Sequence, residues 1–173
     1  MPAPAATVEP IRLGVRVPLP PEAAFRAFTD RFGTWWPREY TWSGDVLESI
    51  GMEPRPGGLL YEHGPLGFSS SWGRVTTWEP GSRLVVSWQI APDRVPEPNP
   101  ARASEVEIRF EPDDGGTRIE LEHRGFERHG PGGAGYRDAL AAEIGWPLIL
   151  DRYATVAATL VGAELNPELQ AGT

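Results

Sequence analysis

The stretch Gly145-Trp-Pro-Leu-Ile-Leu-Asp-Arg-Tyr153 lies in the last long helical pattern of the chain, which runs over about residues 136–160. Apolar residues recur in this pattern at steps of three and four, which places them on one side of a helix. They are Trp146, Ile149, Tyr153, Val156 and Leu160. Pro147 lacks a backbone donor and crowds the carbonyl of Glu143, so we expect a kink in this helix. The apolar stripe needs a partner surface, which the rest of the chain must provide.

Alternation of apolar and polar residues predicts strands over most of the chain before residue 130. The first is Ile11–Val17, and a short helix follows it from Pro21, where proline is tolerated in the first turn. A tight turn at Asp113-Asp-Gly-Gly116 joins two strongly alternating segments, which indicates a hairpin. Further strands are predicted over residues 45–52, 59–62, 72–78, 84–90, 104–110 and 119–123, with loops over 64–71 and 92–100. The pattern therefore predicts an α+β fold in which a curved antiparallel sheet wraps around a long C-terminal helix.

The length of 173 residues favours one domain, which we expect over residues 11–162. Residues 1–10 are rich in proline and alanine and are interpreted as a mobile arm, and residues 163–173 as a tail. The N-terminus lacks the features of a signal peptide, and no apolar run is long enough to span a bilayer. We therefore expect a cytoplasmic protein without membrane insertion.

The charge and the cysteine count exclude several functions. A net charge of −8 argues against binding to nucleic acid, because that binding depends on Lys and Arg at the phosphates. Since the chain has no cysteine, it can form neither a disulfide nor a cysteine-ligated zinc site.

Several short segments occur together in a specific order. They are Trp35-Trp36, Gly73-Arg-Val75, Glu79-Pro80, Phe110, Asp114-Gly-Gly-Thr-Arg118, Glu122-His-Arg-Gly125 and Gly145-Trp146. In this order they resemble the START-like (SRPBCC, Bet v 1-like) superfamily, in the branch named after the activator of heat-shock chaperone ATPase. The resemblance covers about residues 10–162 and implies a helix-grip fold, often with a hydrophobic cavity between sheet and helix. It also implies a choice among lipid or polyketide binding, cyclase or hydrolase chemistry, and interaction with a chaperone.

Seven tryptophans in 173 residues suit either a large core or an aromatic pocket. Trp35 and Trp36 are adjacent, so at least one of them is expected either to face a cleft or to cap the domain. His123 continues the inward face of Ile119 and Leu121, where it would either orient a ligand oxygen or be a buried histidine bonded to a neighbour. The candidate ligand-binding residues are Trp35, Trp36, Trp72, Trp88, His123, Trp146, Ile149 and Tyr153.

Signs of catalysis and of metal binding are weak. Glu62, His63, Glu122, His123 and His129 lack the spacing of a metal site. The serines at 69–71 lack the second glycine of a nucleophile elbow, and the glycines at 130–135 lack the lysine of a phosphate loop. We therefore assign no catalytic residue, metal or cofactor.

Three hypotheses for the function remain open. The first is a carrier that holds a hydrophobic, lipid-like or polyketide-like molecule between sheet and helix. The second is an interaction module with a chaperone or a second copy of the chain as partner. The third is a cyclase-like or dehydratase-like enzyme. A carrier should contain a cavity, whereas an interaction module should expose a large apolar patch.

Overall fold

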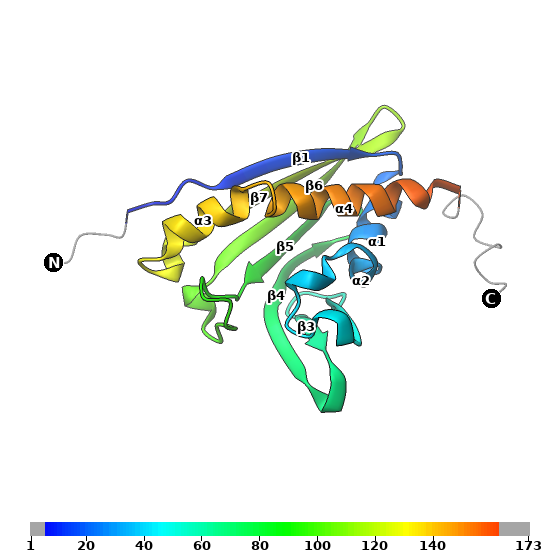
Figure 1. Ribbon diagram of the computed structural model, residues 1–173. Coiled ribbons are helices and arrows are strands. Elements are labelled where there is room, and N and C mark those ends of the chain that lie inside the picture. The colour runs from blue at the N-terminus through cyan, green and yellow to red at the C-terminus, as the bar shows by residue number, and fades with distance from the viewer. Residues whose placement is uncertain (1–5, 163–173) are drawn as a thin grey trace.

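The computed structural model describes residues 6–162, and its centre is a seven-stranded antiparallel sheet (Figure 1). The strands lie in the order β1-β7-β6-β5-β4-β3-β2. Strands β2 to β7 therefore pair in the order in which they occur in the sequence, and β1 is the edge strand next to β7. Their bounds are Ile11–Val17 (β1), Ser49–Met52 (β2), Leu59–His63 (β3), Ser69–Glu79 (β4), Arg83–Trp88 (β5), Ser104–Asp113 (β6) and Gly116–Arg124 (β7). The predicted α+β helix-grip fold is confirmed.

The hairpin of β6 and β7 shows how local sequence sets this topology. Asp113 pairs with Gly116, which leaves Asp114 and Gly115 as a two-residue turn with φ angles of 50° and 82°. A turn of this kind needs positive φ at both central residues, and Asp-Gly is a favoured pair for it. The register that follows buries Ile119, Leu121 and His123 on the concave face.

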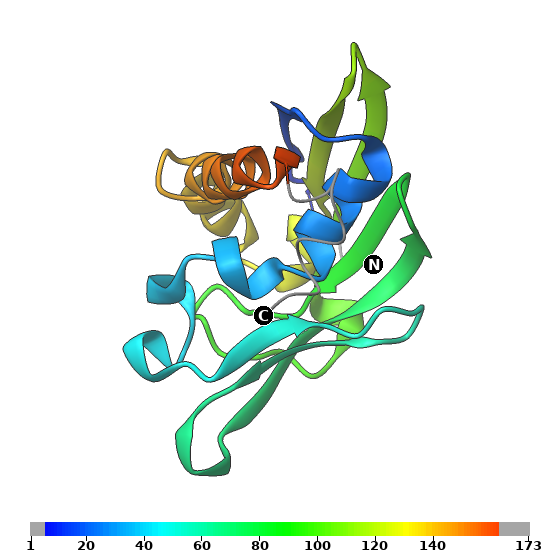
Figure 2. The ribbon, with the colours of Figure 1, turned by 90° about the vertical axis from the view of Figure 1, so that its right-hand side faces the viewer.

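Helices cover the concave face of the sheet, and Figure 2 shows the sheet curving around them. The α-helices are Pro21–Thr29 (α1), Phe32–Trp35 (α2), Gly133–Ala141 (α3) and Trp146–Thr159 (α4). Short 3-10 helices are Arg38–Tyr40 (η1), Gly44–Val46 (η2), Pro65–Gly67 (η3), Pro100–Arg102 (η4) and Phe126–His129 (η5). The buried apolar side chains of the sheet, α1, α2 and α4 belong to one cluster.

The C-terminal helical pattern is interrupted rather than continuous. The expected kink near Pro147 is present as a full break, because α3 ends at Ala141 and α4 begins at Trp146. Gly145 sits so close to the preceding turn that an added Cβ would lie 2.2 Å from the carbonyl oxygen of Leu140. Only glycine permits this approach, and Pro147 then fits the first turn of α4.

Four other predictions need correction. The strand predicted over residues 45–52 is shorter, because residues 44–46 form η2 and β2 begins only at Ser49. Residues 69–71 are not a loop, because β4 begins at Ser69 and these serines pair with β3. Ile90 lies outside β5 and forms only an isolated bridge with Pro96. Val156 is half-buried, since the inward side of α4 turns towards Leu150 and Ala157 instead.

The ends of the predicted domain are only partly described. Residues 1–5 of the predicted arm and the tail at 163–173 lie outside the described residues. The backbone N–H of Val8 donates to the Glu127 carboxylate at 3.3 Å, and Arg137 donates to the carbonyls of Glu9 and Pro10. Within residues 6–162, no helix is long and apolar enough to cross a membrane.

Candidate functional site

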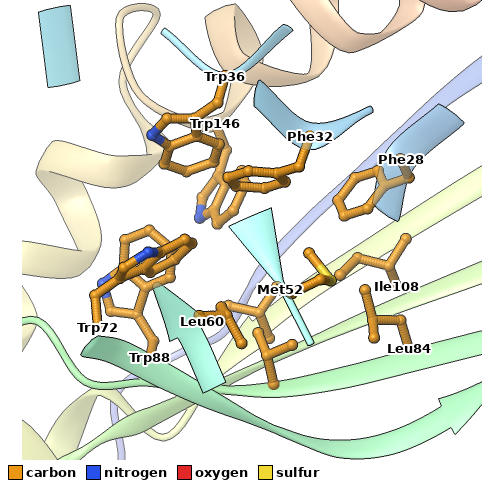
Figure 3. Close-up of a pocket in the computed structure, with 12 residues that line it drawn as sticks. Phe28, Phe32, Trp36, Met52, Leu60, Trp72, Leu84, Trp88, Ile108 and Trp146 are labelled. Atoms are coloured by element: carbon orange, nitrogen blue, oxygen red, sulfur yellow. The ribbon is translucent and has the colours of Figure 1, made fainter. Parts of the chain in front are cut away.

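The space between sheet and helices is almost filled. A cavity of about 20 Å³ remains, which we call the inner cavity, and Figure 3 shows the side chains around it. Trp36, Trp72, Trp88 and Trp146 gather at one end, and aliphatic side chains and Phe28 occupy the other (Figure 3). The full lining is Phe28, Phe32, Trp36, Met52, Leu60, Trp72, Leu84, Val86, Trp88, Val106, Ile108 and Trp146. This volume admits about one water molecule, so the inner cavity alone cannot enclose an organic ligand.

The four indoles form a continuous aromatic cluster. Trp36 stacks on Trp72 with ring centroids 5.6 Å apart, and Trp88 lies 5.6 Å from Trp72 and 5.5 Å from Trp146. Such contacts stabilise the cluster beyond the burial of its area. Trp72 on β4, Trp88 on β5 and Trp146 at the start of α4 therefore meet in one place.

A larger hollow opens beside this cluster, at the break between α3 and α4. Its volume is about 320 Å³, within the range of small-molecule sites, and we call it the mouth pocket. Trp36 and Trp88 line both the mouth pocket and the inner cavity, so their rings form the wall between the two. The other lining residues are Tyr40, Ile90, Pro92, Arg94, Tyr136, Ala139, Leu140, Ile144, Gly145 and Ile149. The break in the helix is what provides this space, because a continuous helix would keep its backbone over the sheet.

Three hydrogen bonds tie the rim of the mouth pocket together. The Tyr40 hydroxyl donates to the carbonyl of Ile144 at 2.5 Å, which joins η1 to the helix break. Arg94 donates to the carbonyl of Tyr40 at 3.3 Å, and the indole of Trp42 donates back to the carbonyl of Arg94 at 2.9 Å. These bonds hold the loop after β5 against the segment after α2, and they define the opening.

Glu62 anchors the same rim from inside the protein. Its carboxylate is fully buried and accepts hydrogen bonds from the backbone N–H groups of Trp42 and Ser43 and from the Ser43 hydroxyl. A buried carboxylate needs such donors, because an unpaired charge in the interior is costly. Glu62 is therefore explained by its role in positioning residues 42–43.

Tyr136 supplies a polar group to the wall of the mouth pocket. Its hydroxyl oxygen accepts the indole N–H of Trp88 at 2.7 Å. Burial raises the pKa of Tyr136 to about 12, although the bond from Trp88 acts in the opposite direction. The hydroxyl therefore stays protonated near neutral pH and keeps its own hydrogen available to a ligand acceptor.

His123 lies behind the aromatic cluster and lines neither the inner cavity nor the mouth pocket. Its Nδ1 accepts the indole N–H of Trp146 at 3.0 Å, which requires the tautomer protonated on Nε2. Nε2–H then donates to the Ser104 hydroxyl at 2.7 Å, and that hydroxyl donates to Nε2 of His129 at 2.7 Å. Both ring nitrogens of His123 are thus used within the protein, as expected of a buried histidine bonded to neighbours.

This chain of hydrogen bonds requires neutral histidines. Burial lowers the pKa of His123 well below its ordinary value, and the nearby His129 lowers it further. Burial also lowers the pKa of His129, while Glu97 acts in the opposite direction. A proton on Nδ1 of His123 would face the N–H of Trp146, so protonation would break the chain at that bond.

The predicted ligand-binding residues separate into four groups. Trp36, Trp88 and Ile149 line the mouth pocket, and Trp72 and Trp146 line only the inner cavity. Trp35 and Tyr153 are core residues, whose polar atoms donate to the carbonyls of Ala27 and Ala24. His123 belongs to neither pocket.

Sequence reasoning missed Tyr40, Arg94 and Tyr136 at the mouth pocket. Tyr40 and Arg94 lie in segments without periodicity, next to Pro37 and Pro92, so no pattern indicated where their side chains point. Tyr136 was placed on the long helix but was not linked to Trp88. The glycine at 145 and the proline at 147 were the one available signal for this pocket, because they indicate the helix break beside which it lies. In the described part of the chain, no cluster of three or more His, Asp or Glu side chains could hold a metal ion.

Comparison with known protein families identifies the family of the chain. Residues 18–158 match the family model described as Activator of Hsp90 ATPase homolog 1-like protein. The chain belongs to this family. No curated protein matches the chain.

Solved structures of similar proteins agree with membership of the Activator of Hsp90 ATPase homolog 1-like family. The anthrahydroquino-gamma-pyrone synthase Txn09, solved in complex with SUM, is 34% identical over 87% of this chain and 97% of its own, with a TM-score of 0.62. CalC from Micromonospora echinospora, a self-sacrificing resistance protein, is 26% identical over 86% of this chain and 93% of its own, with a TM-score of 0.59. Protein NE0264 from Nitrosomonas europaea is 17% identical over 91% and 97%, with a TM-score of 0.61, and shares the fold.

Proposed function

We propose that this protein binds a planar, hydrophobic, polyketide-like small molecule in the mouth pocket. The observation that carries the proposal is a hollow of about 320 Å³ whose wall contains the rings of Trp36, Tyr40, Trp88 and Tyr136. Flat aromatic ligands gain both burial and ring stacking in such a site. The similarity to Txn09, a synthase of an anthrahydroquino-gamma-pyrone, supports a fused aromatic ligand of this kind.

Few polar groups are available to orient the ligand. The Tyr136 hydroxyl can donate to a ligand oxygen, and Arg94 is the one cationic residue in the lining. Among the described residues, Arg94 has no carboxylate partner, and its guanidinium lies 5.9 Å from the Tyr40 ring centroid. A ligand with an acceptor oxygen at one end and fused rings at the other matches this distribution.

A variant that fills the mouth pocket tests the proposal directly. Ala139 is exposed on α3 and lines the pocket, so Ala139→Trp adds a ring there without disturbing the core. With 1,8-dihydroxyanthraquinone as the probe, we expect this variant to weaken binding by about tenfold or more, equivalent to ~1.4 kcal/mol. Ala158→Trp is the matched control, because Ala158 is exposed on α4 and outside the pocket, and it should bind as the wild type does.

Two results would overturn the proposal. One is the absence of binding by the wild type across a panel of planar aromatic ketones and phenols. The other is equal binding by Ala139→Trp and the wild type. The first result would favour the interaction module, with a chaperone or a second copy of the chain as partner, and the family's description points to a chaperone. The second result would show that the ligand binds outside the mouth pocket.

A second candidate is a cyclase-like enzyme that acts in the same pocket, which the synthase Txn09 favours at 34% identity. The Tyr136 hydroxyl would polarise a ligand carbonyl, and the apolar wall would hold a reactive chain in a folded shape. His123 and His129 do not line the mouth pocket and take no part in this candidate. If the protein is an enzyme, Tyr136→Phe should lower turnover more than it lowers substrate binding, whereas a pure carrier would show no turnover in either form.

A further inference from the structure

The mouth pocket differs in charge from the protein as a whole. The chain carries a net charge of −8, but in its described part the lining of the mouth pocket contains Arg94 and no aspartate or glutamate. Asp93 lines an adjoining hollow and not the mouth pocket, and its carboxylate accepts a hydrogen bond from the backbone N–H of Val95 at 3.1 Å. An anionic group in the mouth pocket would therefore meet one cation in the lining and no carboxylate.

The guanidinium of Arg94 has donors that the described residues do not use. It donates one hydrogen bond to them, to the carbonyl of Tyr40 at 3.3 Å. A guanidinium carries five N–H groups in a planar fork, and this shape matches a carboxylate. Arg124 shows the usual arrangement in this protein, since it is paired with the carboxylates of Glu105 and Glu107. At Arg94 the same donors remain available to an acidic group of a ligand.

The backbone of Arg94 adopts a conformation that is unfavourable for an arginine. Its φ angle is 69°, in the left-handed region that glycine occupies without strain. Its N–H closes a turn onto the carbonyl of Ala91 at 2.8 Å, and the N–H of Ala91 donates to the carbonyl of Val95 at 2.8 Å. Such strain is often found at ligand sites, so an arginine at this point of the turn calls for a role of its side chain.

Arg94 lies where an acidic group would keep contact with water. Arg94 is exposed, and together with Tyr40 and Ile90 it lines both the mouth pocket and the adjoining hollow of about 460 Å³. Trp36 and Trp88 line the mouth pocket where it meets the inner cavity. Full burial of an ionised group is costly, so an acid is best placed at the outer of these two ends. A planar ligand with its rings at the indoles could present its acid to Arg94.

We infer that Arg94 is a specificity-determining residue, whose guanidinium binds a carboxylate on the planar aromatic ligand of the mouth pocket. This inference rests on the proposed function and deepens it by naming the charge of the ligand. The ligand class is an aromatic acid, in preference to a neutral molecule with the same rings.

A matched pair of probes, anthraquinone-2-carboxylate and anthraquinone-2-carboxamide, tests the inference, because they share a ring skeleton and differ in charge. We expect the wild type to bind the carboxylate more tightly than the carboxamide by roughly two- to fivefold, as for an ion pair that stays exposed to water. Arg94→Gln removes the cation and should bring this ratio to one or below, because the carboxylate loses more hydration than the amide.

Arg74→Gln is the matched control. Arg74 is also exposed, and its side chain also donates to a backbone carbonyl, that of Gly57 at 3.2 Å, but it lies outside the mouth pocket. This variant loses the same charge and should keep the wild-type ratio. Arg94→Gly covers the case in which Arg94→Gln fails to fold, because glycine adopts the φ angle of 69° without strain. It should lose the preference for the carboxylate as well.

A salt titration of the wild type needs no variant. The ratio should fall as the salt concentration rises from about 0.01 M to about 1 M, because the screening length falls from about 30 Å to about 3 Å. A ratio that does not change with salt would overturn the inference, and so would a preference for the carboxylate that survives in Arg94→Gln and Arg94→Gly. If both probes bind the wild type equally, this inference fails while the proposed function stands. If neither probe nor 1,8-dihydroxyanthraquinone binds, both fail.

Discussion

The inner cavity and the mouth pocket share Trp36 and Trp88 but differ in almost everything else. The inner cavity has a volume of about 20 Å³ between sheet and α4, and the mouth pocket one of about 320 Å³ at the break between α3 and α4. One is bounded by core residues, and the other by a half-exposed rim that hydrogen bonds hold together. The helix-grip fold alone therefore leaves too little space for an organic ligand in this protein. The larger hollow, which we propose as the ligand site, lies where the last helix is interrupted.

The same aromatic residues can stabilise the core and bind a ligand only if these two tasks fall on different faces of their rings. Trp88 could combine both tasks under the proposed function, because its ring packs on Trp72 and Trp146 while its N–H donates to Tyr136 in the wall of the mouth pocket. The predictions below separate the two tasks, beginning with the largest expected effect.

Loss of an inner indole should be the most damaging change. Trp146→Ala removes a buried ring and the donor to His123, so we expect the free energy of unfolding to fall by about 3–5 kcal/mol. Urea denaturation followed by circular dichroism measures this change. Trp42→Ala is the comparison at the rim, where the ring is 38% exposed and the loss should be about 1 kcal/mol. Equal losses of unfolding free energy in the two variants would show that the core and the rim contribute equally to stability.

Acidification should weaken the region behind the cluster. The pKa values of His123 and His129 are lowered in the folded protein, so below the unfolded value of about 6.5 the unfolded chain binds more protons. Stability is then fully present above this pH and is lost as the pH falls below it, by up to about 1.4 kcal/mol per pH unit for each histidine.

Urea titrations between pH 7.5 and 5 measure this slope. His123→Gln removes one of the two histidines with a lowered pKa and should therefore reduce the slope. A stability that does not change over this pH range would contradict the neutral hydrogen-bond chain through Ser104.

A change at the rim should affect ligand exchange more than stability. Tyr40→Phe removes the bond to the carbonyl of Ile144, which is worth about 1 kcal/mol or less at this half-exposed position. We expect faster dissociation of 1,8-dihydroxyanthraquinone in stopped-flow experiments, with nearly unchanged unfolding. Tyr61→Phe is the control, since the Tyr61 hydroxyl makes no hydrogen bond with the described residues and lies outside the mouth pocket. Identical dissociation rates for the two variants would show that the hydrogen bond between Tyr40 and Ile144 does not slow the release of the ligand.

Much of the fold could be predicted from the sequence because period and turn chemistry are local. The Asp-Gly turn set the register of β6 and β7, and the steps of three and four placed Trp146, Ile149 and Tyr153 on one buried side. The site was less predictable, because inward-facing residues can end in a packed core or at a pocket. His123 and Trp88 both point inward, but their surroundings differ. His123 is bonded to Trp146 behind the aromatic cluster, whereas Trp88 is bonded to Tyr136 in the wall of the mouth pocket.

The rim was least predictable, since Tyr40 and Arg94 come together only in the folded protein. Fifty-four residues separate them in the chain, and neither segment has a period. The predicted loop at 64–71 was too long for a related reason. Its last three residues are serines, which show no alternation, and they form a strand only by pairing with β3.

The most direct test of the mouth pocket uses the seven indole N–H signals of the protein as reporters. A ¹H–¹⁵N titration of the wild type with 1,8-dihydroxyanthraquinone follows all of them at once. We predict that the signals of Trp36 and Trp88 shift most, because these rings line the mouth pocket. The signals of Trp35, bonded to Ala27, and Trp78, packed on Phe25, should stay in place. Saturable shifts at Trp35 or Trp78 with Trp36 and Trp88 unchanged would contradict a ligand site at the helix break.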